Sequence, residues 1–580
     1  MYFLMTTALW GADGQRYAPV IPEPEIPSRQ NMPDVSRSEE PQIDENQVLL
    51  PNLKGLLFAD DEKRLYAVSP EKTGIQVEAP SEFAFLQWPE FAPMLQKYLG
   101  KPFTVRQLRQ MEKEIQALYK KHSISFVSVH FPQQDAESGT LQILLVEGKV
   151  GNVYVRGARY FDNQHLSKNL YVQNGNYLDE NDVREDLIWL SRNPFREADI
   201  EIKQTDETGV LDVYYDINDM RPWRGTVGYT DTGTLGTGIE RIFFGGTYGN
   251  LFGKSNLLNY QLTSSSDFKS VVNHSFTWMM PIPETRNYLS VRGNYATLQP
   301  NDLQDGLTWS TGFDLNRRLW TKITENHRRD ARLSVGFEFL HTNTDLDVGG
   351  SQTYSLPVQT AQFIIGFDWI HYSEKGYVAF DTHLHISPGG FSKYNNTEYF
   401  QAFSGTESRS DYLFATMSLD MLRKCTNMDI HCRLFGQVSS AALIAYDQIG
   451  LGGIGSVRGY HQYTSEADGG FIMNLEFLTP SKRVYFDKKL QSMPPYRCLN
   501  KEYEDDLQFY TFLDVGIGID WCNEGDSPDS YPLAGIGVGV KYSFGPWINI
   551  DLAYGFQLID PDMDEYAKTG RPHVSIVFCR

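Results

Sequence analysis

The sequence predicts two small α+β units followed by an all-β transmembrane barrel of 16 antiparallel strands. Segments that alternate apolar and polar residues recur from Trp223 to the end of the 580-residue chain, as in strands with one apolar face. The chain holds 33 Tyr, 34 Phe and 48 Gly at a negative mean hydropathy, which is typical of barrels in which only alternate residues meet lipid. No run approaches the ~18 apolar residues of a membrane-spanning helix.

Residues 1–51 are predicted to be a signal remnant and a linker. Residues 1–12 are mostly apolar and small, like the h-region of a secretory signal. No Lys or Arg precedes them, so we expect a signal peptide truncated at its start, with an ordinary disordered terminus as the alternative. Residues 19–41 are rich in Pro, Glu and Ser and should form an extended linker.

Residues 52–149 and 150–221 are predicted to form the two α+β units. In the first unit, Thr104 and Gln107 match a helix-starting capping box. An apolar stripe at spacings of three and four follows, made of Leu108, Met111, Ile115 and Leu118. The second unit repeats this plan, with a helix striped by Val183, Leu187 and Leu190 and with short alternating strands on either side.

Residues 222–580 are predicted to form the barrel. An even number of strands suits a closed antiparallel barrel whose two ends lie on one side of the membrane. Closure is required, because every backbone polar group in hydrocarbon must be paired. The sixteen candidate strands begin near Arg224, Glu240, Asn256, Ser270, Asn287, Leu307, Arg329, Val358, Gly376, Asp411, Ile430, Gly469, Leu507, Pro532, Trp547 and Arg571.

A glycine-rich segment lies between the eleventh and twelfth of these strands. It carries five glycines between Gly450 and Gly459, so its backbone can enter φ > 0 regions, and Arg458 lies near its tip. Residue alternation places Asp514 on the less apolar face of the thirteenth strand. Because that face would line the lumen, an arginine folded into the barrel would find a carboxylate there.

Two sets of motifs resemble the BamA/TpsB outer-membrane superfamily. The first set is Val457-Arg458-Gly459-Tyr460 followed by Phe512-x-Asp514-x-Gly516, and it is similar to the loop motif and the strand motif of that superfamily. Residues 52–149 and 150–221 resemble its first and second periplasmic POTRA domains. Within that superfamily, the motifs of these two units resemble those of two-partner secretion transporters (TpsB, or haemolysin secretion-activation proteins of ShlB/FhaC/HecB type). The motif residues are Tyr119, Pro132, Gln134, Asp135, Asn193, Pro194 and Arg196.

The resemblance implies a transporter in the bacterial outer membrane with its POTRA domains in the periplasm. Such a protein exports an unfolded secreted partner protein (TpsA-like) through its barrel, and the POTRA motif residues would recognise that substrate. The resemblance also implies contact with outer-membrane lipid and lipopolysaccharide, and a monomer is expected. A BamA-like insertase that assembles other barrels is the alternative, followed by a passive porin. The resemblance also implies that Arg458 folds into the lumen against Asp514 in a bidentate ion pair, where it would either gate export or assembly, or merely stiffen the barrel.

Other chemistries are not expected. The formal net charge of -21 argues against a nucleic-acid partner. No nucleophile, base and orienting group can be placed together, so the chain is not expected to be an enzyme or to need a cofactor. Asp381, His383 and His385 share a strand face that could hold a metal, but polar residues of a water-filled lumen have the same pattern, and no metal is expected.

The five cysteines are too few for a disulfide scaffold. Cys425 and Cys432 flank a short turn between the tenth and eleventh strands, and a disulfide between them is possible in an oxidising periplasm. Cys498 and Cys522 are expected on opposite sides of the membrane, where they cannot pair.

Overall fold

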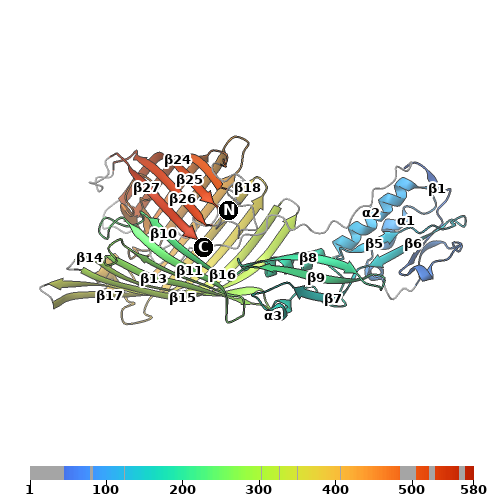
Figure 1. Cartoon of the computed structure of the whole chain (residues 1–580), viewed down its shortest axis with the longest axis horizontal. Helices are drawn as coiled ribbons and strands as arrows, with labels where there is room; N and C mark the ends of the chain where they lie inside the picture. The colour runs from blue at the N-terminus through green and yellow to red at the C-terminus, as the bar shows by residue number, and fades with distance from the viewer. Residues whose placement is uncertain are drawn as a thin grey trace, which may run out of the picture. The chain divides into compact units, whose positions relative to one another are not determined.

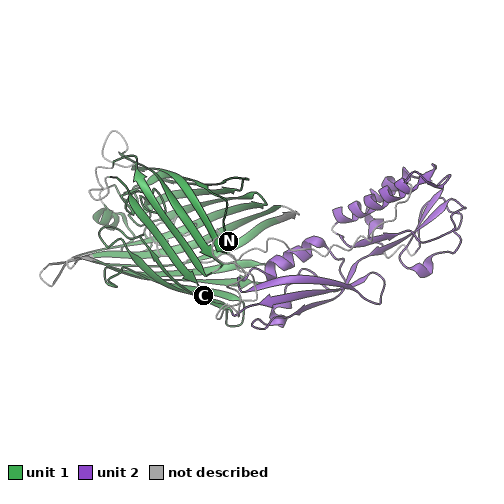
Figure 2. Ribbon diagram, turned by 45° about the horizontal axis from the view of Figure 1, so that its top comes forward, with its two compact units in different colours: residues 1–23, 222–580 green, residues 24–221 purple. Residues whose placement is uncertain are grey.

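The computed structural model describes residues 45–579, except for residues 79–82, 123, 302–303, 325–326, 349–350, 405–406, 484–504, 521–528, 546 and 561–568. The chain divides into two compact units, with the boundary between Arg221 and Pro222 (Figure 2). The predicted signal remnant, Cys498 and Cys522 lie outside the described residues. Of the helices that are described, none has both the length and the apolar character needed to cross a membrane.

The N-terminal unit begins with a four-stranded sheet in the order β3-β2-β6-β5. The strands are β2 (Gly55–Ala59), β3 (Gly74–Val77), β5 (Val127–His130) and β6 (Thr140–Glu147), next to the small pair β1 (Val48–Leu50) and β4 (Phe103–Thr104). Helices α1 (Phe91–Gln96) and α2 (Val105–Lys121) share a core with the sheet, and two 3-10 helices, η3 (Glu62–Arg64) and η4 (Ala84–Gln87), complete this part.

Helix α2 begins at the predicted capping box. The Gln107 N–H donates to Thr104 Oγ1, and the Thr104 N–H donates to Gln107 Oε1 at 2.9 Å, so two free amide groups at the helix start are satisfied together. Met111 and Ile115 on the predicted apolar stripe are fully buried against the sheet.

The second sheet of this unit has three strands in the order β7-β9-β8. They are β7 (Lys149–Arg156), β8 (Arg196–Gln204) and β9 (Val210–Asp219), with helices α3 (Asn163–Ser167) and α4 (Glu180–Leu190). Asp186 on α4 is buried, and its carboxylate accepts hydrogen bonds from the Tyr171 N–H at 2.8 Å, the Val172 N–H at 3.0 Å and the Tyr215 hydroxyl at 3.0 Å. A buried carboxylate with three donors fixes the helix to the sheet.

The C-terminal unit is a closed antiparallel barrel of sixteen strands, which confirms the predicted fold class (Figure 1). Its strands are β10 (Trp223–Thr230), β11 (Arg241–Leu251), β12 (Asn256–Ser264), β13 (Val271–Ile282), β14 (Asn287–Asn301), β15 (Gln304–Thr324), β16 (His327–Val348), β17 (Ser351–Ser373), β18 (Gly376–Pro388), β19 (Asp411–Arg423), β20 (Asp429–Ser439), β23 (Gly469–Leu478), β24 (Asp505–Asp520), β25 (Asp529–Phe544), β26 (Ile548–Gln557) and β27 (Arg571–Cys579). The first strand, β10, pairs with the last, β27.

Residue alternation sets the two faces of the wall as predicted. On β25, Ile536 is 46% exposed and Val538 is 55% exposed, so these side chains face outward. On β23, Asn474 and Glu476 are each 2% exposed, because they face the lumen and the loop that fills it. The period of two along a strand therefore decides which residues meet lipid.

Strand β17 begins seven positions before the predicted Val358. Its first residues are polar and contain little apolar alternation, which is why the pattern does not reveal them. The strand continues there by pairing with β16, as in Val348 with Ser351 and Thr344 with Leu356. Backbone pairing needs no apolar face, so a strand can continue past the lipid without the sequence signal that marks it within the membrane.

The disulfide considered possible between Cys425 and Cys432 is not formed, and both are free cysteines. Cys432 lies on β20 directly opposite Met421, and the last pair of this ladder is Arg423 with Ile430. Cys425 follows β19 and is therefore out of register with Cys432 by several residues. At about 3.3 Å per residue, that offset exceeds the ~7 Å limit between the Cα atoms of a disulfide.

Candidate functional site

The candidate site is the long connection between β20 and β23, residues 440–468, which we call the lumen loop. It carries a short antiparallel hairpin of β21 (Ile449–Leu451) and β22 (Ser465–Ala467). Between these strands, Gly452, Gly453 and Gly459 have φ of 98°, 93° and 102°, a region that glycine enters without strain. The loop is buried along much of its length, with Val457 and Tyr460 fully buried.

Arg458 lies at the centre of the loop and is 2% exposed. Its Nε donates to Asp514 Oδ2 at 2.7 Å, and its Nη2 donates to Asp514 Oδ1 at 2.8 Å. Its own backbone N–H donates to the same carboxylate at 3.0 Å. The guanidinium carbon lies 3.7 Å from the ring centroid of Phe512. Bidentate pairing together with ring stacking fixes both the position and the orientation of the guanidinium.

A second carboxylate completes this charged cluster. Arg458 Nη1 donates to Glu476 Oε1 at 2.6 Å, and Lys541 Nζ donates to Glu476 Oε2 at 2.6 Å. Asn474 Nδ2 donates to Asp514 Oδ1 at 2.8 Å. Two cations thus face two carboxylates, so the formal charges of these four residues balance. Buried charges of this kind are tolerated only when paired and hydrogen-bonded.

Glycines in the barrel wall make room for the loop. A Cβ atom added to Gly535 on β25 would lie 2.0 Å from the Arg458 carbonyl oxygen. A Cβ atom added to Gly555 on β26 would lie 2.4 Å from the Gly459 nitrogen. No side chain fits at these distances, so the loop backbone lies directly on the wall.

Hydrogen bonds to three strands hold the tip of the loop. Tyr460 donates through its hydroxyl to the Ala534 carbonyl at 2.8 Å and to the Ile559 carbonyl at 2.5 Å. Gln557 Nε2 donates to the Gly459 carbonyl at 3.0 Å, and the Gly459 N–H donates to His573 Nε2 at 2.9 Å.

The first part of the loop has its own anchor on the opposite side of the lumen. The Asp447 carboxylate accepts hydrogen bonds from the Tyr412 hydroxyl at 2.6 Å and from Gln362 Nε2 at 2.7 Å. The Tyr446 hydroxyl donates to Glu338 Oε1 at 3.1 Å. An apolar cluster also joins this part to α5 (Thr397–Ser404) and to the wall, and consists of Leu340, Val358, Phe400, Tyr412, Phe414, Ala441, Leu443 and Ile444.

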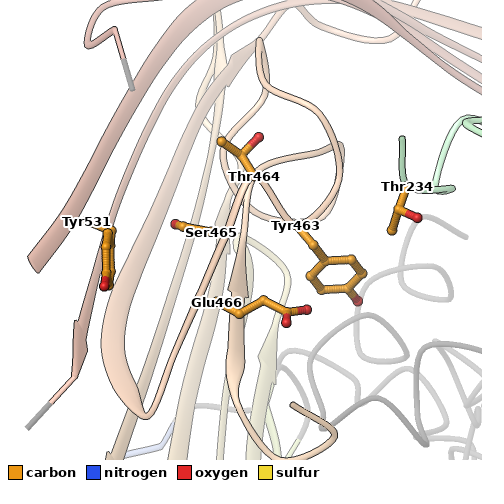
Figure 3. A pocket seen from close by; sticks show the side chains of 6 residues that line it. All are labelled: Thr234, Tyr463, Thr464, Ser465, Glu466 and Tyr531. Carbon is orange, nitrogen blue, oxygen red and sulfur yellow. The ribbon is translucent and has the colours of Figure 1, made fainter. Parts of the chain in front are cut away.

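A shallow polar pocket lies where the loop runs back toward β23. Figure 3 shows its six lining side chains, which come from the loop, from the connection after β10 and from β25. They are Thr234, Tyr463, Thr464, Ser465, Glu466 and Tyr531. Hydroxyl and carboxylate groups dominate this lining, which suits water better than an apolar ligand.

The motif residues of the N-terminal unit mostly support its fold. Tyr119 is fully buried and donates to Glu147 Oε1 at 2.6 Å, and burial with this carboxylate raises the pKa of Tyr119. Gln134 accepts the Gln142 N–H at 2.7 Å and donates to the Gln142 carbonyl at 2.8 Å, as a neighbouring strand would. The Asp135 carbonyl accepts the Ser69 N–H at 2.9 Å.

The motif residues Asn193, Pro194 and Arg196 also support the fold of the N-terminal unit. Asn193 Oδ1 accepts the Phe195 N–H at 3.2 Å, and Arg196 Nε donates to the Leu190 carbonyl at 2.5 Å while its guanidinium lies over Phe161. Pro194 lies in the turn between these two side chains, and is half-buried. Residues of this motif therefore connect α4 to β8.

Sequence reasoning identified Arg458 and Asp514 but missed Glu476, Lys541 and His573 as their neighbours. The lumen-facing parity of Glu476 and Lys541 was available from the sequence, on strands that flank the one carrying Asp514. His573 lies on the last strand, 114 positions from Gly459, and no local sequence pattern links the two. The described residues contain no group of three or more side chains that could hold a metal ion together. This includes the three residues considered from the sequence, Asp381, His383 and His385.

A closed sixteen-stranded barrel whose lumen holds a buried loop, preceded by small α+β units, defines an outer-membrane barrel protein with periplasmic POTRA domains. The chain belongs to the haemolysin secretion/activation protein family ShlB/FhaC/HecB, whose model matches residues 210–542, more than half of the chain. A POTRA domain of ShlB type matches residues 73–148. It is therefore an outer-membrane transporter of two-partner secretion, and the transporter reading is favoured over the insertase.

Individual relatives agree with this assignment. The heme/hemopexin transporter protein HuxB of Haemophilus influenzae is 24% identical over 67% of this chain and 68% of its own length. The outer membrane transporter CdiB of Dickeya dadantii is 21% identical over 65% of this chain and 67% of its own length. The solved structure of CdiB from Escherichia coli shares the fold at a TM-score of 0.67 and 16% identity, covering 98% of this chain and 94% of that one.

Proposed function

We propose that the lumen loop is a latch, held by Arg458, that must leave its site before a secreted partner protein can pass through the barrel. The observation that supports this most directly is the burial of Arg458 between Asp514 and Glu476. The loop occupies space in the lumen that an exported chain would need. The transporter acts without a catalytic step, and folding of the passenger outside the cell draws it across.

The contacts of the loop suit a latch, because several charged hydrogen bonds hold Arg458 in one buried position. Arg458 donates four hydrogen bonds to two carboxylates, counting its backbone N–H. Breaking a buried pair by removing one partner costs about 3–5 kcal/mol, since an uncompensated charge remains. A passenger that supplies alternative contacts could displace the loop at lower cost.

A disulfide between the loop and the wall tests this proposal. A Cβ atom added to Gly516 would lie 2.8 Å from Val457 Cγ2, so the pair V457C and G516C lies within disulfide range. In a chain whose native cysteines are replaced by Ser, oxidation of this pair should abolish secretion, and reduction should restore it. Secretion that continues with the disulfide formed would overturn the latch.

Removal of the guanidinium provides a second test. Arg458→Ala should leave a heat-modifiable barrel in the membrane and reduce export of the partner protein. The matched control is Arg409→Ala, because Arg409 also pairs with a carboxylate, that of Asp411 at 2.6 Å, but both side chains are more than half exposed. The control should secrete normally, and unchanged secretion by the Arg458 variant would count against the latch.

We also infer that the POTRA units recognise the unfolded partner by adding its strand to an open sheet edge. The edge strands are β3 and β5 in the first sheet and β7 and β8 in the second. The motif residues, from Tyr119 to Arg196, would contribute by shaping these sheets. Strand addition is favoured because main-chain hydrogen bonds hold an extended chain of any sequence.

A photo-crosslinker placed on the edge strand β5 can test this recognition. Ser128 on the edge strand β5 is exposed, and Lys113, which is also exposed but lies on helix α2, is the matched control. During secretion the crosslinker at residue 128 should capture the partner protein, and the one at residue 113 should not. Equal capture at the two positions would contradict strand addition at this edge.

Outside the barrel, we place lipid and lipopolysaccharide against the outward apolar side chains and propose that the transporter acts as a monomer. Closure of the barrel within one chain leaves no unpaired strand in the membrane, so a second copy is not needed for pairing. The mass of the protein in detergent, measured by light scattering, should correspond to one chain.

A further inference from the structure

The barrel closes through a short pairing between its first and last strands. Five residue pairs join β10 to β27, from Thr226 with Cys579 to Thr230 with Ser575, whereas every other neighbouring pair of barrel strands is joined by eight or more. We call this pairing the closing seam. With so few backbone bonds, side chains beyond the ladder contribute more to holding it.

Asp231, directly after β10, extends the closing seam with its side chain. Its N–H donates to the Val574 carbonyl at 3.2 Å, and its Oδ1 accepts the Val574 N–H at 3.2 Å. Its Oδ2 accepts hydrogen bonds from Arg571 Nη2 at 3.1 Å and from His573 Nδ1 at 3.0 Å. One carboxylate next to the first strand thus binds Arg571, His573 and Val574 of the last strand, and Asp231 is only 8% exposed.

His573 connects this carboxylate to the lumen loop. The Gly459 backbone can only donate at its N–H, so His573 Nε2, 2.9 Å away, must be the acceptor. A neutral imidazole with an unprotonated Nε2 carries its proton on Nδ1, where it donates to Asp231. The ring is 1% exposed, and water has little access to replace either bond. Arg571 also reaches the loop, through a contact between its Nη1 and His461 Nδ1.

We propose that His573 is a positioning residue that couples the lumen loop to the closing seam through Asp231. Release of Gly459 from His573 frees the imidazole to turn, which removes one of the bonds that hold β27 to Asp231. The reverse also holds, because coupling between two sites is reciprocal. The inference rests on the proposed displacement of the loop, and it adds that the loop cannot move without loosening the strands that close the barrel.

Thr226 gives a direct means to lock the seam. Its Oγ1 lies 3.8 Å from Cys579 Sγ, and the two residues are direct partners in the ladder. Thr226→Cys should therefore form a disulfide with the native Cys579. The remaining native cysteines are replaced by Ser. A Ser456→Cys substitution then reports the position of the loop, because residue 456 is only 4% exposed and the introduced thiol can react with a maleimide only after the loop leaves.

The test compares maleimide labelling of the full-length protein in vesicles with the seam locked and unlocked, in three backgrounds. With native His573, locking the seam should slow labelling roughly five- to ten-fold, the effect of about one hydrogen bond. With His573→Phe, labelling should be fast and insensitive to the lock. With His573→Gln, whose amide can both accept and donate, the effect of the lock should return.

An equal effect of the seam lock in all three backgrounds, or none in the native background, would overturn the coupling. A general loss of barrel stability is recognised separately, because it would lower the heat-modification midpoint of the Phe and Gln variants together. Failure of the latch itself is distinguishable, since it would appear as secretion with the V457C and G516C disulfide formed.

Discussion

At the scale of single residues, the charges around Arg458 show how a strongly charged group can be buried in a lumen. The Asp514 carboxylate accepts hydrogen bonds from Nε and Nη2 of Arg458, and the Glu476 carboxylate accepts one from Arg458 and one from Lys541. Each carboxylate is therefore matched by a cation on another strand or on the loop. The arrangement links β23, β24 and β25 to the loop through a single cluster.

Lys541→Met should weaken this cluster without dissolving it. Glu476 would keep Arg458 as a partner but lose the bond from Lys541 Nζ, and Lys541 is partly exposed, so we expect a loss of about 1–3 kcal/mol. The heat-modification midpoint of the variant should fall by several degrees, whereas Arg409→Met, at the exposed pair, should not change it. An unchanged midpoint for Lys541→Met would mean that water replaces the lysine.

The carboxyl of Glu90 should titrate unusually low. Its hydrogen bond with His122, followed by contacts with its own backbone and with Lys121, lowers the pKa of Glu90 to about 2. Because this folded-state pKa lies below the ordinary 4.5, the contribution of Glu90 to stability is present above pH 4.5 and is lost as the pH falls toward 2. A carbon NMR titration of residues 45–221 should find the midpoint near 2.

The His122→Ala variant is the control for this titration. Without the imidazole, the midpoint of Glu90 should move up toward 4.5, although Lys121 still donates to Glu90 Oε1 at 3.1 Å. A midpoint near 4.5 in the native protein would show that the contact with His122 is not kept in solution.

At the scale of elements, the wall glycines decide how closely the loop can approach β25 and β26. Gly535→Ala should displace the loop, because its Cβ would lie 2.0 Å from the Arg458 carbonyl oxygen, which is backbone and cannot rotate away. The Ser456→Cys reporter should then label faster. Gly246→Ala on β11 is the control, since nothing lies within 4 Å of its added Cβ, and it should leave labelling unchanged.

Most elements were predictable because their signals are local. The α2 capping box and the alternation on β23 and β25 are written in consecutive residues, and so is the glycine-rich loop. The Arg458–Asp514 ion pair was predictable because parity and the motif pair place both residues in the lumen. The anchor around Asp447 was not, because it needs Gln362 and Tyr412, which lie 85 and 35 positions away and carry no local pattern.

The pair Cys425 and Cys432 shows that closeness in the sequence does not by itself place two side chains together. Two cysteines around a short turn look close in sequence, but the strand register places Met421 opposite Cys432. Each thiol should therefore react separately with a small maleimide after unfolding in denaturant without reductant, and mass spectrometry should find two adducts on the peptides that carry residues 425 and 432. Finding these two peptides linked by a disulfide, with neither thiol labelled, would contradict this expectation.

At the scale of the whole molecule, the chain divides into two units at Arg221–Pro222, and the proposed function assigns recognition to the first and passage to the second. A chain that begins at Pro222 should still insert as a heat-modifiable barrel, because all sixteen strands and the lumen loop lie after that point. It should not secrete the partner protein, for lack of the sheets that capture it. Secretion by the shortened chain would place substrate recognition in the barrel.

Strands β15, β16 and β17 are 21, 22 and 23 residues long, about twice the ~9–11 residues that cross a bilayer. The pairing of β17 with β18 stops at Phe363 with Ile386, so residues 351–362 of β17 continue past it while still paired with β16. Because a strand that extends past the bilayer is not held to an apolar outer face, we expect the sequence of this extension to vary among relatives, whereas Arg458 and its buried neighbours should stay constant.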